Sequence, residues 1–210
     1  MCKRSALLLT GLAVLIMGLG VSAASARNLS VSSQTFSMTW SRFQFVNGMS
    51  EQVLQECPVT LEGRFTSRTF TKAESGQIGQ VTRAEVAGAS CNREVFSTGA
   101  SLAAETLPWA LTYESFAGTL PRITGLNLYV RNRGERLFFM REQCLYEGAM
   151  GLRLGLSAAG TIESVEGDPP RTLLLRRSGN SFICPGSITD RGSGAVTVEG
   201  GITHITVTLI

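Results

Sequence analysis

The chain has 210 residues, of which 43% are hydrophobic and 17% charged, a composition typical of a folded globular protein and not of a disordered one. It carries 19 Lys and Arg against 16 Asp and Glu, and Lys3 and Arg4 lie in a segment that we expect to be removed, which leaves a net charge of +1. A nearly neutral chain lacks the basic surface that nucleic-acid binding needs, and its single histidine argues against histidine-rich metal sites and most histidine-based catalysis.

Residues 1–26 have the pattern of a secretory signal peptide. The two basic residues precede an uncharged run over residues 6–21, and Ala24-Ser25-Ala26 matches the small-residue site that signal peptidase recognises. The apolar run is shorter than the ~20 residues that a membrane-spanning helix needs. We therefore predict cleavage after Ala26, a secreted or extracytoplasmic mature chain that starts at Arg27, and no membrane span within it.

The remaining chain alternates between apolar and polar residues with a period of two, which is typical of β-strands that have one face in water. Clear runs lie at residues 36–45, 57–65, 107–113, 126–130, 152–156 and 196–209. The alternation changes phase between Trp40 and Phe43, which predicts a β-bulge near Ser41 and Arg42. Gly200 and Gly201 separate two alternating runs and predict a hairpin turn.

Stretches rich in Gly, Pro, Asn and Ser separate these runs, and loops are expected at residues 99–101, 166–170 and 190–194. Only residues 101–105 suit a short helix. The regular spacing of the alternating runs predicts an all-β fold with little helix, either an antiparallel β-sandwich or a closed β-barrel. We expect residues 27–210 to form one β-rich domain. The phase of the alternation places seven side chains in the interior: Trp40, Leu61, Trp109, Leu111, Leu128, Leu154 and Val207.

Four cysteines remain after the signal peptide, and an even number in an exported chain favours disulfide bonds. Of the three possible pairings we predict Cys57–Cys91 and Cys144–Cys184, which close loops of 35 and 41 residues. The chain-entropy model gives each such bond about 4 kcal/mol of stabilisation. No cysteine has a near neighbour at the spacing of a zinc site, so we expect neither a metal nor a cofactor.

Residues 33–40, the run Cys57-Pro-Val-Thr-Leu-Glu-Gly63 and residues 107–124 resemble a family of exported, functionally uncharacterised proteins from high-GC soil bacteria. The resemblance implies a signal peptide and a β-rich secreted domain, and it implies no catalytic residue. A weak echo between the segments that begin at Cys57-Pro58 and Cys184-Pro185 leaves open that the domain consists of two related β halves.

Candidate catalytic and metal-binding residues are few. His204 lies in phase with the wetter face of its run, so we expect an exposed histidine without a catalytic role. Glu163, Glu166 and Asp168 cluster where a calcium ion could bind, but the sequence lacks the Asp-x-Asp-x-Asp-Gly pattern and solvated acids are the simpler interpretation.

Two groups of arginines could build an anion-binding face. They are Arg131, Arg133, Arg136 and Arg141, and Arg171, Arg176 and Arg177. Glu135 and Glu142 alternate with the first group, which favours ordinary cross-strand pairs at the surface.

An aromatic platform for sugars is another alternative, from Trp40, Trp109, Tyr113, Tyr129 and Tyr146. The phase of the two tryptophans favours burial, whereas Tyr129 lies on the polar face of its run.

These observations favour an exported, disulfide-stabilised, non-catalytic β-module that binds an unknown extracellular ligand or surface. The alternative is a secreted hydrolase that acts on an extracellular polymer, for which Glu56, Glu62 and Glu114 would have to converge in one pocket. An outer-membrane barrel would instead need an apolar belt on its outer surface.

Overall fold

The computed structural model describes residues 28–87, 91–93, 97–120, 122–139, 142–179, 182–201 and 203–210. The predicted signal peptide, its cleavage site and Arg141 lie outside these residues. The described chain is almost entirely β-structure, which confirms the predicted fold class. None of its helices is long and apolar enough to cross a membrane.

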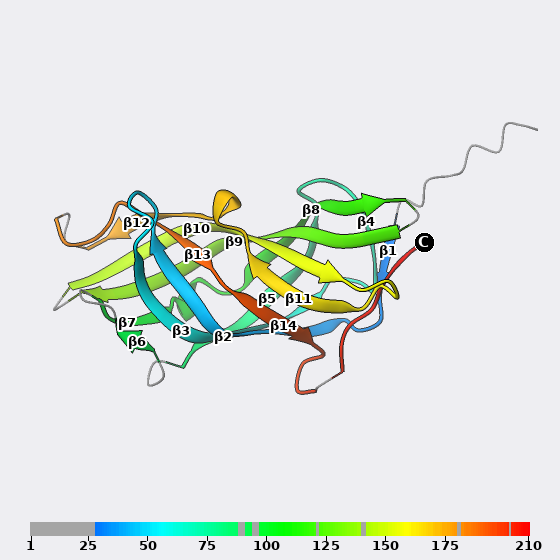
Figure 1. Ribbon diagram of the computed structural model, residues 1–210, viewed down its shortest axis with the longest axis horizontal. Helices are drawn as coiled ribbons and strands as arrows, with labels where there is room; N and C mark the ends of the chain where they lie inside the picture. Colours follow the sequence, from blue (N-terminus) through cyan, green and yellow to red (C-terminus); the bar gives the residue numbers. More distant parts are fainter. Residues whose placement is uncertain are drawn as a thin grey trace, which may run out of the picture.

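Strands follow one another with short connections (Figure 1). They are β1 (Asn28–Val31), β2 (Thr35–Asn47), β3 (Val53–Phe65), β4 (Thr69–Thr71), β5 (Gln77–Val86), β6 (Asn92–Arg93), β7 (Ser97–Leu102), β8 (Trp109–Thr119), β9 (Arg122–Phe139), β10 (Glu142–Leu156), β11 (Ile162–Gly167), β12 (Leu173–Ser178), β13 (Ser187–Arg191), β14 (Ser193–Thr197) and β15 (Val207–Leu209). Two short 3-10 turns cover Ala104–Thr106 and Pro169–Arg171.

The large sheet closes on itself into a barrel. Antiparallel pairing runs from β2 through β3, β5, β8, β9, β10, β11 and β14, and β14 pairs with β2 again. Towards the other end of the long strands, β12 and β13 take the place of β11 and β14 between β10 and β2. Closing the long strands into a ring leaves fewer free strand edges along which other chains could pair.

A separate three-stranded sheet lies at the end of the barrel where the chain terminates (Figure 1). In it β1 lies between β4 and β15, with Leu29 opposite both Phe70 and Leu209. Leu29, Val31 and Phe70 are buried against the barrel core, so this sheet covers one opening of the ring.

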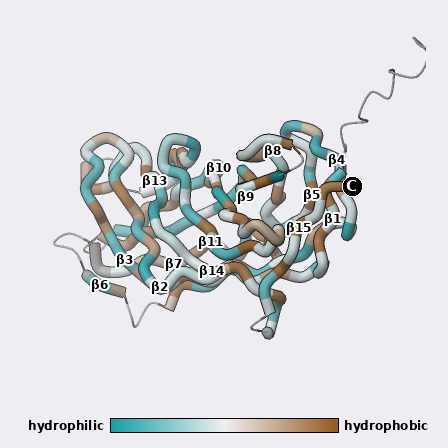
Figure 2. Tube along the Cα trace, turned by 45° about the vertical axis from the view of Figure 1, so that its right-hand side comes forward, coloured by the Kyte–Doolittle hydropathy of each residue, from teal (hydrophilic) through white to brown (hydrophobic). Residues whose placement is uncertain are grey.

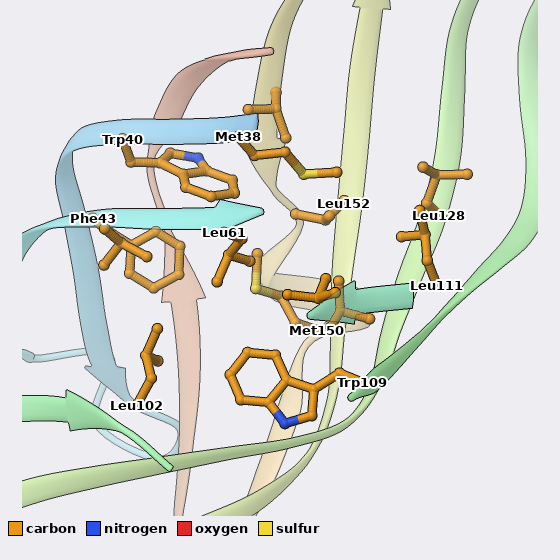
Figure 3. Close-up of a cluster of buried hydrophobic side chains, with 14 of the residues drawn as sticks. Met38, Trp40, Phe43, Leu61, Leu102, Trp109, Leu111, Leu128, Met150 and Leu152 are labelled. Atoms are coloured by element: carbon orange, nitrogen blue, oxygen red, sulfur yellow. The ribbon is translucent and has the colours of Figure 1, made fainter. Parts of the chain in front are cut away.

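Apolar side chains fill the interior of the barrel. Along the strands, hydrophobic and hydrophilic residues alternate (Figure 2). All seven side chains predicted to point inward are at most 6% exposed. Figure 3 shows Trp40 and Phe43 of β2 converging with Trp109 of β8 and Met150 of β10. The apolar faces of the strands therefore point into the barrel, where they form one core.

Both disulfide bonds have the predicted pairing. Cys57–Cys91 joins the middle of β3 to the segment before β6, and Cys144–Cys184 joins the start of β10 to the segment before β13. The predicted bulge is also present, because Trp40 lies opposite Val59 and Phe43 opposite Cys57, which leaves two residues of β2 facing one of β3.

Several local expectations were wrong. Residues 99–101 belong to β7, and residues 190–194 belong largely to β13 and β14, because strand pairing outweighs their Gly and Ser content. The turn at Gly200 and Gly201 exists, with the Val198 amide donating to the Thr203 carbonyl at 2.8 Å. It is not a simple hairpin, because β15 leaves the barrel and pairs with β1.

Candidate functional site

A β-bulge in the middle of β9 decides where its charged side chains point. Arg131 lies opposite Ala149 and Arg133 lies opposite Gly148, so Asn132 is an extra residue without a partner on β10. Its φ of 61° is in the left-handed region, which asparagine tolerates better than most residues. One extra residue reverses the alternation, so the side chains from Arg133 onward exchange faces.

Arg133 and Glu135 therefore face the barrel interior, where both are 0% exposed. The sequence assigned Arg133 to an anion-binding face or to ordinary cross-strand pairs with Glu135, and unbroken alternation after Val130 would have turned both side chains outward. That prediction was wrong for this physical reason. Asp190, expected in a loop, lies in β13 and is also 0% exposed.

These three side chains form a buried charge cluster. Nη1 of Arg133 lies 2.8 Å from Oδ2 of Asp190, and Nη2 forms an ion pair with Oε1 of Glu135. The guanidinium also lies 5.2 Å from the ring centre of Phe43 and 5.8 Å from that of Trp109. Aromatic faces attract a cation, and this attraction is stronger where water is absent.

The buried charge cluster holds two carboxyl groups against one guanidinium. Burial raises the pKa of Glu135 well above its usual range, the charge of Arg133 opposes this rise, and the charge of Asp190 adds to it. Burial also raises the pKa of Asp190, whereas Arg133 and a hydrogen bond with Glu135 both oppose that rise. The cluster is electrically neutral when Glu135 carries a proton and Asp190 does not.

A carboxyl pair that shares a proton can serve acid–base catalysis, but only where a substrate reaches it. Here all three side chains of the buried charge cluster lack exposed surface. The arrangement can hold a proton and fix the positions of β9 and β13, and it offers no access to a substrate.

A cleft of about 410 Å³ lies on the outer side of the same bulge. It is lined by Thr106, Arg131, Asn132, Glu147, Gly148, Ala149 and Arg177. We call it the outer cleft. It brings one arginine from each of the two predicted arginine groups together.

Neighbouring side chains fix both arginines of the outer cleft. Nε of Arg131 donates to Oγ1 of Thr112 at 3.1 Å, and its guanidinium lies 4.9 Å from the ring centre of Tyr129. Nε of Arg177 lies 3.1 Å from Oε2 of Glu147. Held in this way, the arginines lose less conformational freedom when they bind a ligand.

The other arginines do not join this cleft. Arg136 pairs with Glu105, and Nη1 of Arg176 donates to the Cys184 carbonyl at 3.0 Å. Arg171 lies near Asp168. Of the seven arginines predicted to form an anion-binding face, only Arg131 and Arg177 line the outer cleft, and Arg141 lies outside the described residues.

The candidate acids do not converge. Glu56 accepts hydrogen bonds from Arg42, Gln44 and Asn92, and the bond from Arg42 is the largest of the effects that lower its pKa to about 2.

Glu62 pairs with Arg83 at 3.2 Å, and Glu114 lies 4.0 Å from Arg131. Each of the three acids thus faces a different arginine, which argues against the acidic pocket of a hydrolase.

The other candidate sites are not assembled either. His204 is exposed as predicted, with Nδ1 3.1 Å from the Val196 carbonyl oxygen. Glu163 and Glu166 are exposed, whereas Asp168 is buried and lies 3.6 Å from both Arg153 and Arg171. Within the described residues, no group of three or more His, Cys, Asp or Glu is placed to hold a metal ion.

The five aromatic residues do not form a platform. Trp40, Trp109, Tyr113 and Tyr146 are buried in the core, and half-buried Tyr129 packs under Arg131. A second cavity, of about 350 Å³, is more apolar and lies near the Cys144–Cys184 bond. Its lining residues are Asn47, Gln52, Leu54, Phe139, Phe182, Ile183 and Pro185.

Sequence reasoning missed the buried charge cluster and the outer cleft because both depend on one unpaired residue in β9. The available signal was Asn132 itself, since asparagine is unfavourable in a strand but suits a bulge. No family model, curated protein or solved structure matches this chain.

Proposed function

We propose that this protein is an exported, disulfide-stabilised, non-catalytic β-module that binds an extracellular ligand or surface. The observation that carries the proposal is the sealed interior. Large apolar side chains fill the barrel, and its only fully buried charged groups among the described residues are Arg133, Glu135 and Asp190, all without exposed surface. A ligand therefore has to bind outside, on the wall or at an end of the barrel.

Export is supported by two features. Two disulfide bonds suit an oxidising compartment. Residues 1–26 have the basic, apolar and small-residue segments of a signal peptide.

The outer cleft is the best candidate for the ligand site. It places the guanidinium groups of Arg131 and Arg177 beside the carboxylate of Glu147 in one depression on the barrel wall. Arg133, by contrast, is out of reach of any ligand. Polar groups that converge in a concave site and are already held by neighbours are typical of specific recognition.

Export can be tested by expressing the full chain in a bacterial host and measuring the intact mass of the protein from the periplasm. We expect a chain that begins at Arg27 and contains two disulfides. An uncleaved chain extracted from the membrane would contradict the export proposal.

Binding and catalysis can be separated with dye-labelled peptidoglycan, cellulose and chitin. We expect the protein to be retained on one of them without releasing dye, and Arg131→Gln or Arg177→Gln to weaken retention. Arg83→Gln is the matched control, because Arg83 is an exposed arginine on the barrel wall.

Dye release that Glu56→Gln or Glu114→Gln abolishes would favour the hydrolase instead. Absence of retention on all three polymers would contradict binding to polymers of this kind.

A further inference from the structure

We propose that Glu135 and Asp190 form a proton-binding site inside the barrel, which takes up one proton when the protein folds and makes the fold more stable in mildly acidic surroundings. The site is independent of the outer cleft and of the ligand proposed above.

The first support is the charge balance of a sealed space. Three ionisable groups, two acidic and one basic, meet with 0% exposure. If both acids were ionised, one negative charge would have no partner in a region from which water is excluded. Such a charge is so unfavourable that the group binds a proton instead.

The second support is the geometry of the two carboxyl groups. The 2.8 Å contact with Arg133 favours the ionised form of Asp190. Glu135 contacts the other terminal nitrogen of the same guanidinium, so the two carboxyl groups lie close together in one enclosed space. A protonated Glu135 beside an ionised Asp190 leaves one negative charge for Arg133 to balance, whereas two ionised carboxylates would repel each other.

The third support is what surrounds Glu135 on the neighbouring strands. Its cross-strand neighbours are Tyr146 on β10 and Leu102 on β7, and both are buried. Burial raises the pKa of Tyr146, so its hydroxyl stays neutral and adds no charge beside Glu135. Phe43, Trp109 and Met150 complete the surroundings of Arg133. Arg133 contacts both carboxyl groups, and its single positive charge can balance only one negative charge.

The direction of the pH dependence follows from this arrangement. The folded state holds a proton on Glu135 at pH values where an unfolded glutamic acid, with a pKa of about 4.3, has lost it. Between the unfolded and the folded pKa, the folded state therefore binds one more proton than the unfolded state. The unfolding equilibrium constant then rises about tenfold per pH unit. The stabilisation that this proton contributes is therefore fully present below the unfolded pKa of Glu135 and is lost as the pH rises through its folded pKa.

The test is urea unfolding of the intact, disulfide-bonded protein at a series of pH values between about 5 and about 9, compared with Glu135→Gln. Glutamine has the shape of the protonated side chain and does not titrate. We expect the tenfold rise per pH unit in the unmodified protein and its loss in Glu135→Gln. The matched control Glu163→Gln removes an exposed acid and should keep the rise.

A second measurement keeps the proposal falsifiable if the substituted protein does not fold. Infrared spectra of the unmodified protein near neutral pH should contain the carbonyl stretch of a protonated carboxyl group. A spectrum with ionised carboxylates only would overturn the proposal. Equal pH dependence in the unmodified protein and in folded Glu135→Gln would also overturn it.

Discussion

Substitution of Arg133 by methionine tests the energetics of the buried charge cluster directly. In the folded protein Arg133 lies 2.8 Å from Asp190, forms an ion pair with Glu135 and has no exposed surface. Arg133→Met keeps much of the side-chain volume but leaves the ionised Asp190, beside Glu135, without a positive charge. Removing one partner of a buried ion pair typically costs about 3–5 kcal/mol. The free energy of unfolding of a typical domain is about 5–15 kcal/mol, so this loss is a large part of the total.

The measurement is chemical unfolding followed by tryptophan fluorescence, which is sensitive here because Trp109 lies 5.8 Å from the guanidinium. Arg83→Met serves as the control, since Arg83 is 61% exposed in its ion pairs and exposed pairs contribute about 0–1 kcal/mol.

The combined variant Arg133→Met, Glu135→Leu and Asp190→Leu removes all three ionisable groups and should recover most of the lost stability, because apolar residues often replace buried ion pairs without loss. The reasoning is refuted if Arg133→Met costs no more than Arg83→Met.

Three further predictions concern other parts of the structure, and each is tested by the free energy of unfolding. Trp109→Ala should cost about 3–5 kcal/mol through the cavity it leaves, whereas exposed His204→Ala should change stability by less than about 0.5 kcal/mol; similar values for the two would contradict the buried core. Asn132→Val should cost about 1–2 kcal/mol because a β-branched residue resists the left-handed φ, while Asn132→Gly should be tolerated; equal effects would argue against the bulge. Glu56→Gln should remove stability that is present above about pH 4 and is lost as pH falls towards the folded pKa of about 2, so an acid titration of the variant that matches the unmodified protein would disprove the role of Arg42.

The parts of the fold that could be predicted from the sequence are those that follow from local alternation. Apolar residues such as Trp40, Leu61 and Leu128 keep the phase of their own strand, and burial of that face requires them to point inward. The bulge at Ser41 and Arg42 was visible because apolar residues flank it on both sides and reveal the change of phase.

The buried charge cluster could not be predicted in this way. Beyond Asn132 the first two inward residues of β9 are Arg133 and Glu135, so the change of phase is masked by charge. Their partner Asp190 comes from β13, which is distant in sequence, and no local pattern encodes that contact. The outer cleft also depends on contacts between residues that are distant in the sequence. Arg131 and Arg177 meet only because β12 pairs with β10 and β10 with β9.

The small sheet has a consequence for the order in which the fold can be completed. Leu29 and Leu209 are paired although they lie about 180 residues apart in the chain. Because β1 finds one of its two partners only in residues 207–209, the cover over that opening cannot be finished until those residues have been synthesised. Contacts of such long range are also slow to form, since a long loop has to close first. A partly synthesised chain therefore leaves this end of its apolar interior accessible, for example to a chaperone that binds it before folding is complete.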